Sequence, residues 1–135
     1  CRCAAPCAPR PRLTAARWSP EKAAGFHDLL SGMSDCADRE QYEEYVRLHR
    51  DFHLLLAQAT DNAIVEATER SFLETMDHEG WQDMERQLYL PNRTEVLRES
   101  VGEHAAIVEA VAARDGGAAS ALMHAHFTKY EAQEA

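Results

Sequence analysis

The sequence predicts an all-α protein, an antiparallel bundle of about six helices. Apolar residues recur at spacings of three and four along almost the whole chain, as one buried face of a helix requires. No segment alternates apolar and polar residues over the length of a half-buried strand. The breaks between the periodic segments are short, which favours antiparallel packing of consecutive helices.

Composition and charge narrow the class of protein further. The 135 residues are the length of one domain, and 45% hydrophobic residues suffice for an ordinary core. No apolar run approaches the ~20 residues that span a bilayer, so no membrane segment is expected. A net charge of −9 repels phosphate backbones, so this chain alone is a poor candidate for binding nucleic acid.

The first twelve residues differ in composition from the rest. They hold Cys1, Cys3 and Cys7 among prolines and arginines, and no later cysteine pair completes a metal site with them. We expect residues 1–12 to be a disordered or non-native tail, and residues 13–135 to form the domain. A soft-metal clip or a lipidated terminus are the alternatives for the tail. Because no secretory signal is recognisable, we expect a cytoplasmic location.

The first two helices have recognisable beginnings. Ser19, Pro20 and Glu21 provide a capping hydroxyl, a proline at the first helical position and an acid in the first turn. This helix is expected to end near Gly32. Asp38 with Gln41 is expected to open the second helix. Its apolar face carries Tyr42, Tyr45, Val46, Phe52, Leu56 and Ala59.

The middle of the chain is predicted to hold a third helix and a short further run. Asp61-Asn62 breaks the second helix and caps the third, whose apolar positions are Val65, Phe72 and Met76. Gly80 interrupts this helix. A short apolar-periodic run and a turn follow, with Trp81, Met84 and Leu88 and then Pro91-Asn92.

The last two helices form a hairpin. Ser100 and Glu103 have the spacing of a capping box, which places the start of a helix there, although Thr94 offers an earlier start. This helix is expected to run to about Arg114. Asp115-Gly116-Gly117 turns the chain, and the final helix is expected from about Ala118 to Tyr130.

Four of the seven histidines occupy positions that should be apolar. His49 and His53 continue the apolar face of the second helix, and His104 and His126 continue the faces of the last two. An unsatisfied polar group in an apolar core costs roughly 1–3 kcal/mol, so four rings together require a shared partner.

The hairpin geometry places two of these rings at one height. His104 lies about eleven residues before the turn and His126 about ten or eleven after it. With His49 and His53 one helical turn apart, the four make a plausible inward-facing metal site. Alternatively, each is a core histidine hydrogen-bonded to a neighbouring carboxylate or carbonyl. His124 and His78 are expected at the surface, and His27 is not assigned a place.

Two segments resemble a known family. HRDFHLLLAQATDN (residues 49–62) resembles the D-x-x-F-H-x-x-L-A-x-A-x-x-N signature of the FCD domain, the C-terminal domain of FadR-type GntR transcription regulators. SVGEHAAIVEAVAARDGGAASALMHAHF (residues 100–127) resembles that family's segment containing the E-H motif and the last-helix histidine. The resemblance covers about residues 13–130.

The resemblance implies a helical, dimeric, effector-binding domain with a divalent metal. Its ligand positions correspond to His49, His53, His104 and His126. The family usually has aspartate at the first position, and here Asp51 is displaced by two. Four imidazoles should favour zinc, nickel or copper over manganese or magnesium, and we expect zinc or nickel. The winged-helix DNA-reading domain of the family has no counterpart in this sequence, so DNA contact is expected only through such a separate domain.

The sequence is compatible with three classes of function. The first is a sensor that binds a small organic acid at the metal, with Arg98 as a candidate contact to that effector. The second is a metal-dependent hydrolase, which needs a base that is not a ligand; Glu103 is adjacent to His104 but is expected to point elsewhere. The third is a structural bundle without a ligand. Metal content and turnover distinguish them.

Overall fold

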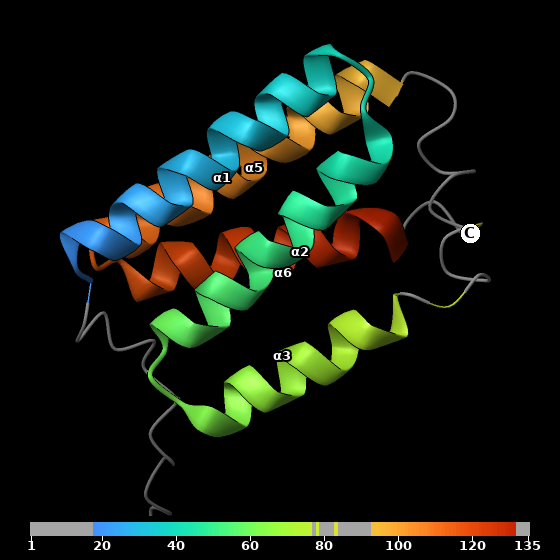
Figure 1. Ribbon diagram of the computed structural model, residues 1–135. Helices are drawn as coiled ribbons and strands as arrows, with labels where there is room; N and C mark the ends of the chain where they lie inside the picture. The colour runs from blue at the N-terminus through green and yellow to red at the C-terminus, as the bar shows by residue number, and fades with distance from the viewer. Residues whose placement is uncertain (1–17, 77, 79–82, 84–92, 132–135) are drawn as a thin grey trace, which may run out of the picture.

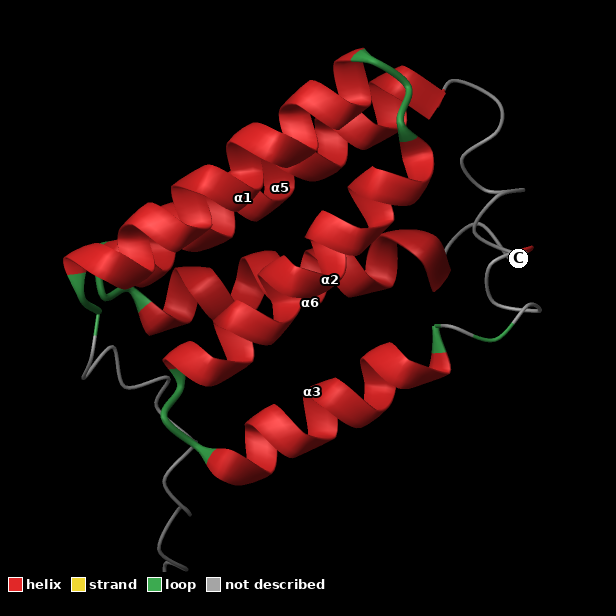
Figure 2. Cartoon of the chain, viewed as in Figure 1, coloured by secondary structure: helices red, strands yellow, loops and turns green. Residues whose placement is uncertain are grey.

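A computed structural model of the chain describes residues 18–76, 78, 83 and 93–131. Within these residues there are five helices and no strand, which confirms the all-α prediction (Figure 2). The helices are α1 (Pro20–Asp38), α2 (Tyr42–Ala59), α3 (Ala63–Thr75), α5 (Arg93–Ala112) and α6 (Gly116–Glu131). The expected tail, the run from Trp81 to Leu88 and the Pro91-Asn92 turn lie outside the described residues.

The helices form an antiparallel bundle with α3 at its edge. Helices α1 and α5 lie side by side, α2 crosses next to both α1 and α6, and α3 packs against α2 (Figure 1). Consecutive helices α1 and α2, α2 and α3, and α5 and α6 run in opposite directions. None of the described helices is both long and apolar enough to cross a membrane.

Helix α1 begins as predicted but continues past Gly32. The Ser19 side chain accepts a hydrogen bond from the Lys22 backbone N–H at 3.2 Å. The expected end at Gly32 is wrong, because the helix continues to Asp38. A Cβ on Gly32 would lie 3.0 Å from Leu48 Cδ1, so glycine here permits close packing of α1 on α2. That packing offsets the roughly 1 kcal/mol that glycine costs inside a helix.

The corner between α1 and α2 also differs from the prediction. Asp38 ends α1 instead of opening α2, and Gln41 precedes α2 without a side-chain capping bond. Glu40 adopts a left-handed backbone with φ of 57°, and the Gln41 N–H donates to the Cys36 carbonyl at 2.9 Å. This hydrogen bond spans five residues and is the one that ends a helix in the Schellman motif. The left-handed position of the motif is usually a glycine, but here it is Glu40.

Helix α3 is capped as predicted but turns a different face to the protein. The Asn62 side chain accepts hydrogen bonds from the backbone N–H groups of Ile64 and Val65. Of the expected core residues only Met76 is buried, while Val65 and Phe72 are each 40% exposed. Leu73 is buried instead. Among the described helices α3 packs mainly against α2, so it buries one narrow stripe there, and the sequence periodicity alone does not show where that stripe lies.

Helix α5 starts at Arg93, so the capping-box interpretation of Ser100 is wrong and the earlier start near Thr94 is closer. Ser100 is buried in the middle of the helix, one turn after the fully buried Leu97. The chain turns at Asp115 as predicted, but α6 starts at Gly116, two residues before the expected Ala118, and the Asp115 side chain accepts from the Ala118 N–H at 2.9 Å.

The apolar layer between α1, α2 and α5 forms most of the described core. Trp18 stacks on Phe26, and Phe26 meets Phe52 edge to face at 5.3 Å between ring centroids. The buried residues of this apolar layer are Phe26, Met33, Cys36, Ala37, Tyr42, Tyr45, Phe52 and Leu97. The Phe52 ring also contacts the ring of His104, 4.7 Å away, so the apolar layer borders directly on the histidines.

Candidate metal centre

The structure brings the four predicted histidines into one cluster. His49 and His53 lie one turn apart on α2, His104 comes from α5 and His126 from α6. One ring nitrogen from each lies within 4.8 Å of the others. His53, His104 and His126 are buried, and His49 is partly exposed. The equal heights predicted for His104 and His126 are confirmed by a centroid separation of 4.5 Å.

The Nε2 atoms of three rings point toward one another. His53 Nε2 lies 3.1 Å from His49 Nε2 and 3.2 Å from His104 Nε2. The Nδ1 atoms face outward to oxygen atoms. His104 Nδ1 donates to the Ser100 carbonyl at 2.6 Å, and His126 Nδ1 donates to the Glu103 carboxylate at 2.8 Å.

These outer hydrogen bonds determine where the protons lie. A carbonyl or carboxylate only accepts, so His104 and His126 carry their proton on Nδ1 when neutral. The Nε2 atom of His104 then presents its lone pair to Nε2 of His53. A single proton on His53 Nε2 can be donated to one of its two close Nε2 neighbours and not to both. Within the neutral cluster, at least one of these two close nitrogen pairs therefore cannot form a hydrogen bond.

Burial keeps the rings of His49, His53 and His104 neutral. Desolvation, followed by the neighbouring imidazoles, lowers the pKa of His53 to about 3. Desolvation and His126 lower the pKa of His104 to about 4, although the Ser100 carbonyl and Glu103 oppose this shift. The pKa of His49 is held well below its ordinary value for the same reasons. Neutral imidazole is the form that binds a metal.

The spacing suits a first-row metal ion. Tetrahedral zinc with Zn–N bonds of about 2.0–2.1 Å separates its ligand nitrogens by about 3.3–3.4 Å, and adjacent octahedral ligands at the same distance lie about 3.0 Å apart. The two Nε2–Nε2 distances, 3.1 and 3.2 Å, fall at this scale. The residues present therefore fit a divalent transition metal.

Two acids that support the cluster were not predicted. Glu103 was expected to point away from the site, and this was wrong. Its side chain extends from α5 to α6, where its carboxylate accepts a hydrogen bond from His126 Nδ1. Glu69 of α3 lies with Oε1 3.7 Å from His53 Nδ1. Both contacts join different helices, so no spacing within one helix could reveal them. Carboxylates behind metal-bound histidines fix the ring orientation and raise ligand basicity.

Other residues singled out in the sequence lie elsewhere. The Arg98 side chain is 58% exposed and pairs with Asp38 at 2.7 Å, joining α5 to the end of α1. Its contact with an effector stays a prediction. Arg50 donates to the Leu73 carbonyl and so ties α2 to α3. His27, His78 and His124 are exposed, which confirms the expectation for the last two.

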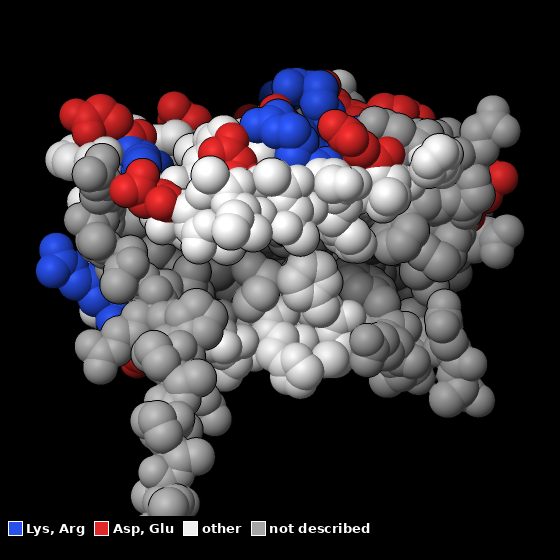
Figure 3. All heavy atoms as spheres, turned by 90° about the horizontal axis from the view of Figure 1, so that it is seen from below, with Lys and Arg blue, Asp and Glu red and all other residues white. Residues whose placement is uncertain are grey.

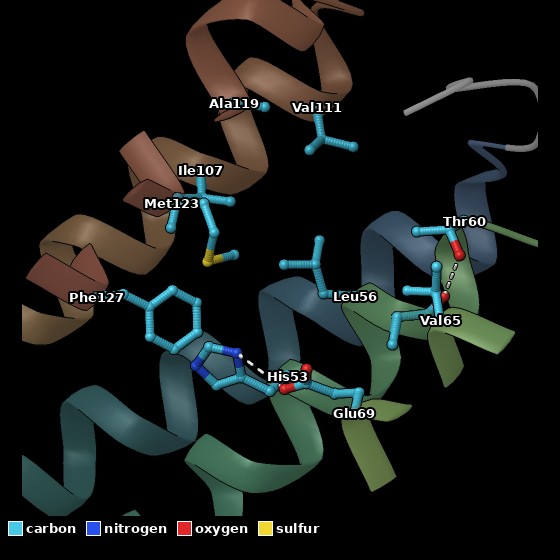
Figure 4. A pocket seen from close by; sticks show the side chains of 11 residues that line it. His53, Leu56, Thr60, Val65, Glu69, Ile107, Val111, Ala119, Met123 and Phe127 are labelled. Carbon is cyan, nitrogen blue, oxygen red and sulfur yellow. Dashed lines mark hydrogen bonds and ion pairs between the residues drawn. The ribbon is translucent and has the colours of Figure 1, made fainter. Parts of the chain in front are cut away.

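A cavity of about 180 Å³ adjoins the cluster on the side of His53. It lies between α2, α3, α5 and α6, and Figure 4 shows Glu69 and the His53 ring at one end of it, with apolar side chains around the rest. His53 is the one residue that the cavity lining shares with the histidine cluster.

The comparison with family models gives one match. The model of the FCD domain matches residues 11–129, which is most of the chain. No curated protein and no solved structure matches the chain. The matched segment contains all four clustered histidines and every described helix apart from the last residues of α6. The chain therefore belongs to the FCD domain family, the effector-binding regulatory domains of GntR-type transcription regulators.

Proposed function

We propose that this domain is a metal-containing sensor in which His49, His53, His104 and His126 hold one divalent transition metal. One observation carries the proposal: four imidazoles from three helices converge, and the outward hydrogen bond of His104 leaves its Nε2 lone pair facing His53 Nε2, 3.2 Å away. Lone pairs at this separation repel one another unless a cation lies between them. A structural bundle without a ligand offers no such cation.

Zinc or nickel suits this donor set best. Imidazole is a preferred ligand of both ions, whereas manganese and magnesium prefer carboxylate and water oxygens. When bound, the ion supplies a Lewis-acidic position for a ligand oxygen. Tetrahedral coordination by four imidazoles would close the site, while five or six positions leave one or two open.

The effector that fits an open position is a small organic acid. A carboxylate with an α-hydroxyl or keto oxygen can chelate the ion, which supplies the positive charge that the acidic chain lacks. In the regulator, we propose that this domain forms a homodimer and that its ligand state controls a separate winged-helix domain that reads DNA.

The acids beside the cluster favour a sensor over a hydrolase. Glu103 and Glu69 face the Nδ1 side of His126 and His53, away from the converging Nε2 atoms. A general base for metal-activated water has to lie on the open side of the ion. The proposed role of Glu103 is therefore to orient the ring of His126.

Metal binding is tested by titrating chelator-treated protein with zinc and with nickel. We expect one ion per chain. His53→Ala should reduce the affinity strongly, and His124→Ala, which removes an exposed histidine two residues from His126, should leave it unchanged. Equal losses in the two variants, or no binding to the wild-type chain, would overturn the metal site.

The effector class is tested separately by thermal denaturation. A ligand that binds only the folded state raises the melting temperature. Lactate, malate, citrate and gluconate should be compared on the zinc-loaded and the metal-free protein. Stabilisation by one acid that disappears in His104→Ala supports an acid bound at the metal. An equal effect on the metal-free protein would place the acid elsewhere, and no effect from any acid would contradict this effector class.

A further inference from the structure

The cavity beside His53 lies one helical turn beyond the imidazoles. Its lining includes Leu56 and Ala57 after His53, Ile107 after His104, and Met123 before His126. Its volume, about 180 Å³, slightly exceeds an engineered apolar cavity of about 150 Å³ that stays dry and binds benzene. The space therefore corresponds to one six-membered ring with a small substituent.

Ligands can reach this cavity from solvent. Val65 of α3 and Phe127 of α6 line it and remain 40% and 46% exposed. They belong to the few large hydrophobic residues that the described surface exposes, together with Ile64 and Phe72. In the view from below, most of the charged side chains that are coloured gather along the upper edge, and uncharged side chains form a band directly next to them (Figure 3).

The charge of the lining selects the class of ligand. Among the described residues that line the cavity there is no lysine or arginine, and their one carboxylate belongs to Glu69. The Thr60 hydroxyl already donates to the Ala57 carbonyl at 2.7 Å, within its own helix (Figure 4). An anion in this cavity would meet Glu69 and gain no counter-charge, so a free carboxylate is disfavoured.

Glu69 is placed to accept a hydrogen bond from a ligand. Its side chain is 25% exposed, and its nearest ion-pair contact, 3.7 Å to His53 Nδ1, exceeds hydrogen-bond length. An ionised carboxylate has about four acceptor positions, so the His53 contact leaves most of them available.

We propose that this cavity is a second ligand site, which binds a small apolar molecule about the size of a benzene ring that carries an amine or hydroxyl donor for Glu69. The site goes beyond the proposed metal sensor, because none of its contacts requires a metal ion. An occupant would nevertheless lie against His53, so that the two sites share one residue.

A series of benzene derivatives of similar size tests this selectivity. Benzylamine, benzyl alcohol, toluene and benzoate differ mainly in charge and hydrogen-bond donors. Dissociation constants of about 1 mM are expected for the best of such small ligands. The binding should be measured by chemical-shift titration of ¹⁵N-labelled protein, both zinc-loaded and chelator-treated, because the metal-free result does not depend on the metal site.

We expect benzylamine and benzyl alcohol to bind more tightly than toluene, and benzoate at least tenfold more weakly than benzylamine, with shifted amides around residues 56–69 and 107–123. Glu69→Gln should remove most of the preference for benzylamine over benzoate, whereas Glu74→Gln, at an exposed position of the same helix, should keep it. Binding by the zinc-loaded protein alone would show coordination to the metal and overturn the cavity site.

Filling the cavity provides an independent test. Ala119→Leu adds bulk in the buried wall, and Val65→Phe adds it at the partly exposed mouth, where folding is less sensitive. Either variant that folds should weaken benzylamine binding at least tenfold. Unchanged binding in a folded filling variant, equal affinity for benzoate, or no binding of any probe at 10-fold above the expected constant (about 10 mM) would overturn the proposal.

Discussion

The apolar layer between α1, α2 and α5 and the imidazole cluster between α2, α5 and α6 share two helices but differ in what stabilises them. In the apolar layer, Phe26, Met33 and Leu97 are fully buried, and removing their surface from water is itself favourable. In the cluster, His104 is equally buried, and its pKa is lowered to about 4. The pKa is low because a protonated ring is unfavourable where water is excluded. Phe52 contacts both regions.

The two regions differ in whether they require a bound ion for stability. The apolar layer is complete once the helices pack, whereas the cluster leaves converging nitrogen lone pairs that a cation would satisfy. A single bundle can thus combine a layer that defines the fold with a layer whose stability depends on a ligand. Such an arrangement suits a sensor, because the ligand then acts on the packing of α2, α5 and α6 directly.

The largest expected effect comes from the apolar layer. Phe26→Ala should lower the free energy of unfolding by about 3–5 kcal/mol, since it removes a fully buried ring that stacks on Trp18 and meets Phe52. Urea denaturation of the wild-type protein and the variant, with and without zinc, measures this loss in the free energy of unfolding. The loss should be the same in both conditions, and a loss seen only with zinc would contradict the independence of this layer.

Zinc should act on the cluster alone. At a free concentration 100 to 1,000 times its dissociation constant, zinc is expected to stabilise the wild-type protein by about 3–4 kcal/mol. His104→Ala should abolish most of this gain, and His124→Ala should retain it. If His104→Ala were stabilised as much as the wild-type protein, the ion would bind somewhere else.

Acid should weaken the metal-free cluster. The folded-state pKa values of His53 and His104, about 3 and about 4, lie below the ordinary value of 6.5, so the unfolded chain binds more protons. Their contribution to stability is complete above pH 6.5 and is lost as the pH falls toward 4 and 3. Between pH 7.5 and 5.5 the loss should be on the order of 1 kcal/mol for each ring.

Urea midpoints of chelator-treated protein at the two pH values provide this measurement. His53→Ala should show a smaller difference than the wild-type chain, because one depressed pKa is removed. Stability that is unchanged or higher at pH 5.5 would contradict the neutral, buried state of the rings.

The smallest effect should come from the acid behind His126. Glu103→Gln keeps an oxygen that can accept a hydrogen bond from His126 Nδ1 but removes the negative charge. Zinc affinity is therefore expected to fall only about tenfold, the low end of the effect of removing a carboxylate behind a metal-bound histidine. Glu109→Gln, at an exposed position of the same helix, is the matched control. Equal affinities in the two variants would assign Glu103 no part in holding the metal ligand.

The histidine positions could be predicted from the sequence because they follow from periodicity within helices. His49 and His53 occupy the apolar face of α2, and counting from the Asp115 turn places His104 opposite His126. The contacts of Glu103 and Glu69 could not be predicted in this way, because each joins one helix to another and depends on how the helices pack.

Local signals were also overridden by packing in two places. Gly32 normally weakens a helix, but here it allows α1 to approach Leu48 of α2, so the helix continues. Ser100 matches a capping position, but burial of Leu97 one turn earlier favours an earlier start of α5, and Ser100 then supplies its carbonyl to His104.

The proposed metal site requires four imidazoles to share one ion, and X-ray absorption spectroscopy of the zinc-loaded protein tests this directly. The spectrum should show nitrogen ligands at about 2.0–2.1 Å and the outer-shell scattering of four imidazole rings. His126→Ala should lose one ring from this pattern. A first shell containing sulfur at about 2.3 Å, or two imidazoles or fewer in the wild-type protein, would contradict the proposed site.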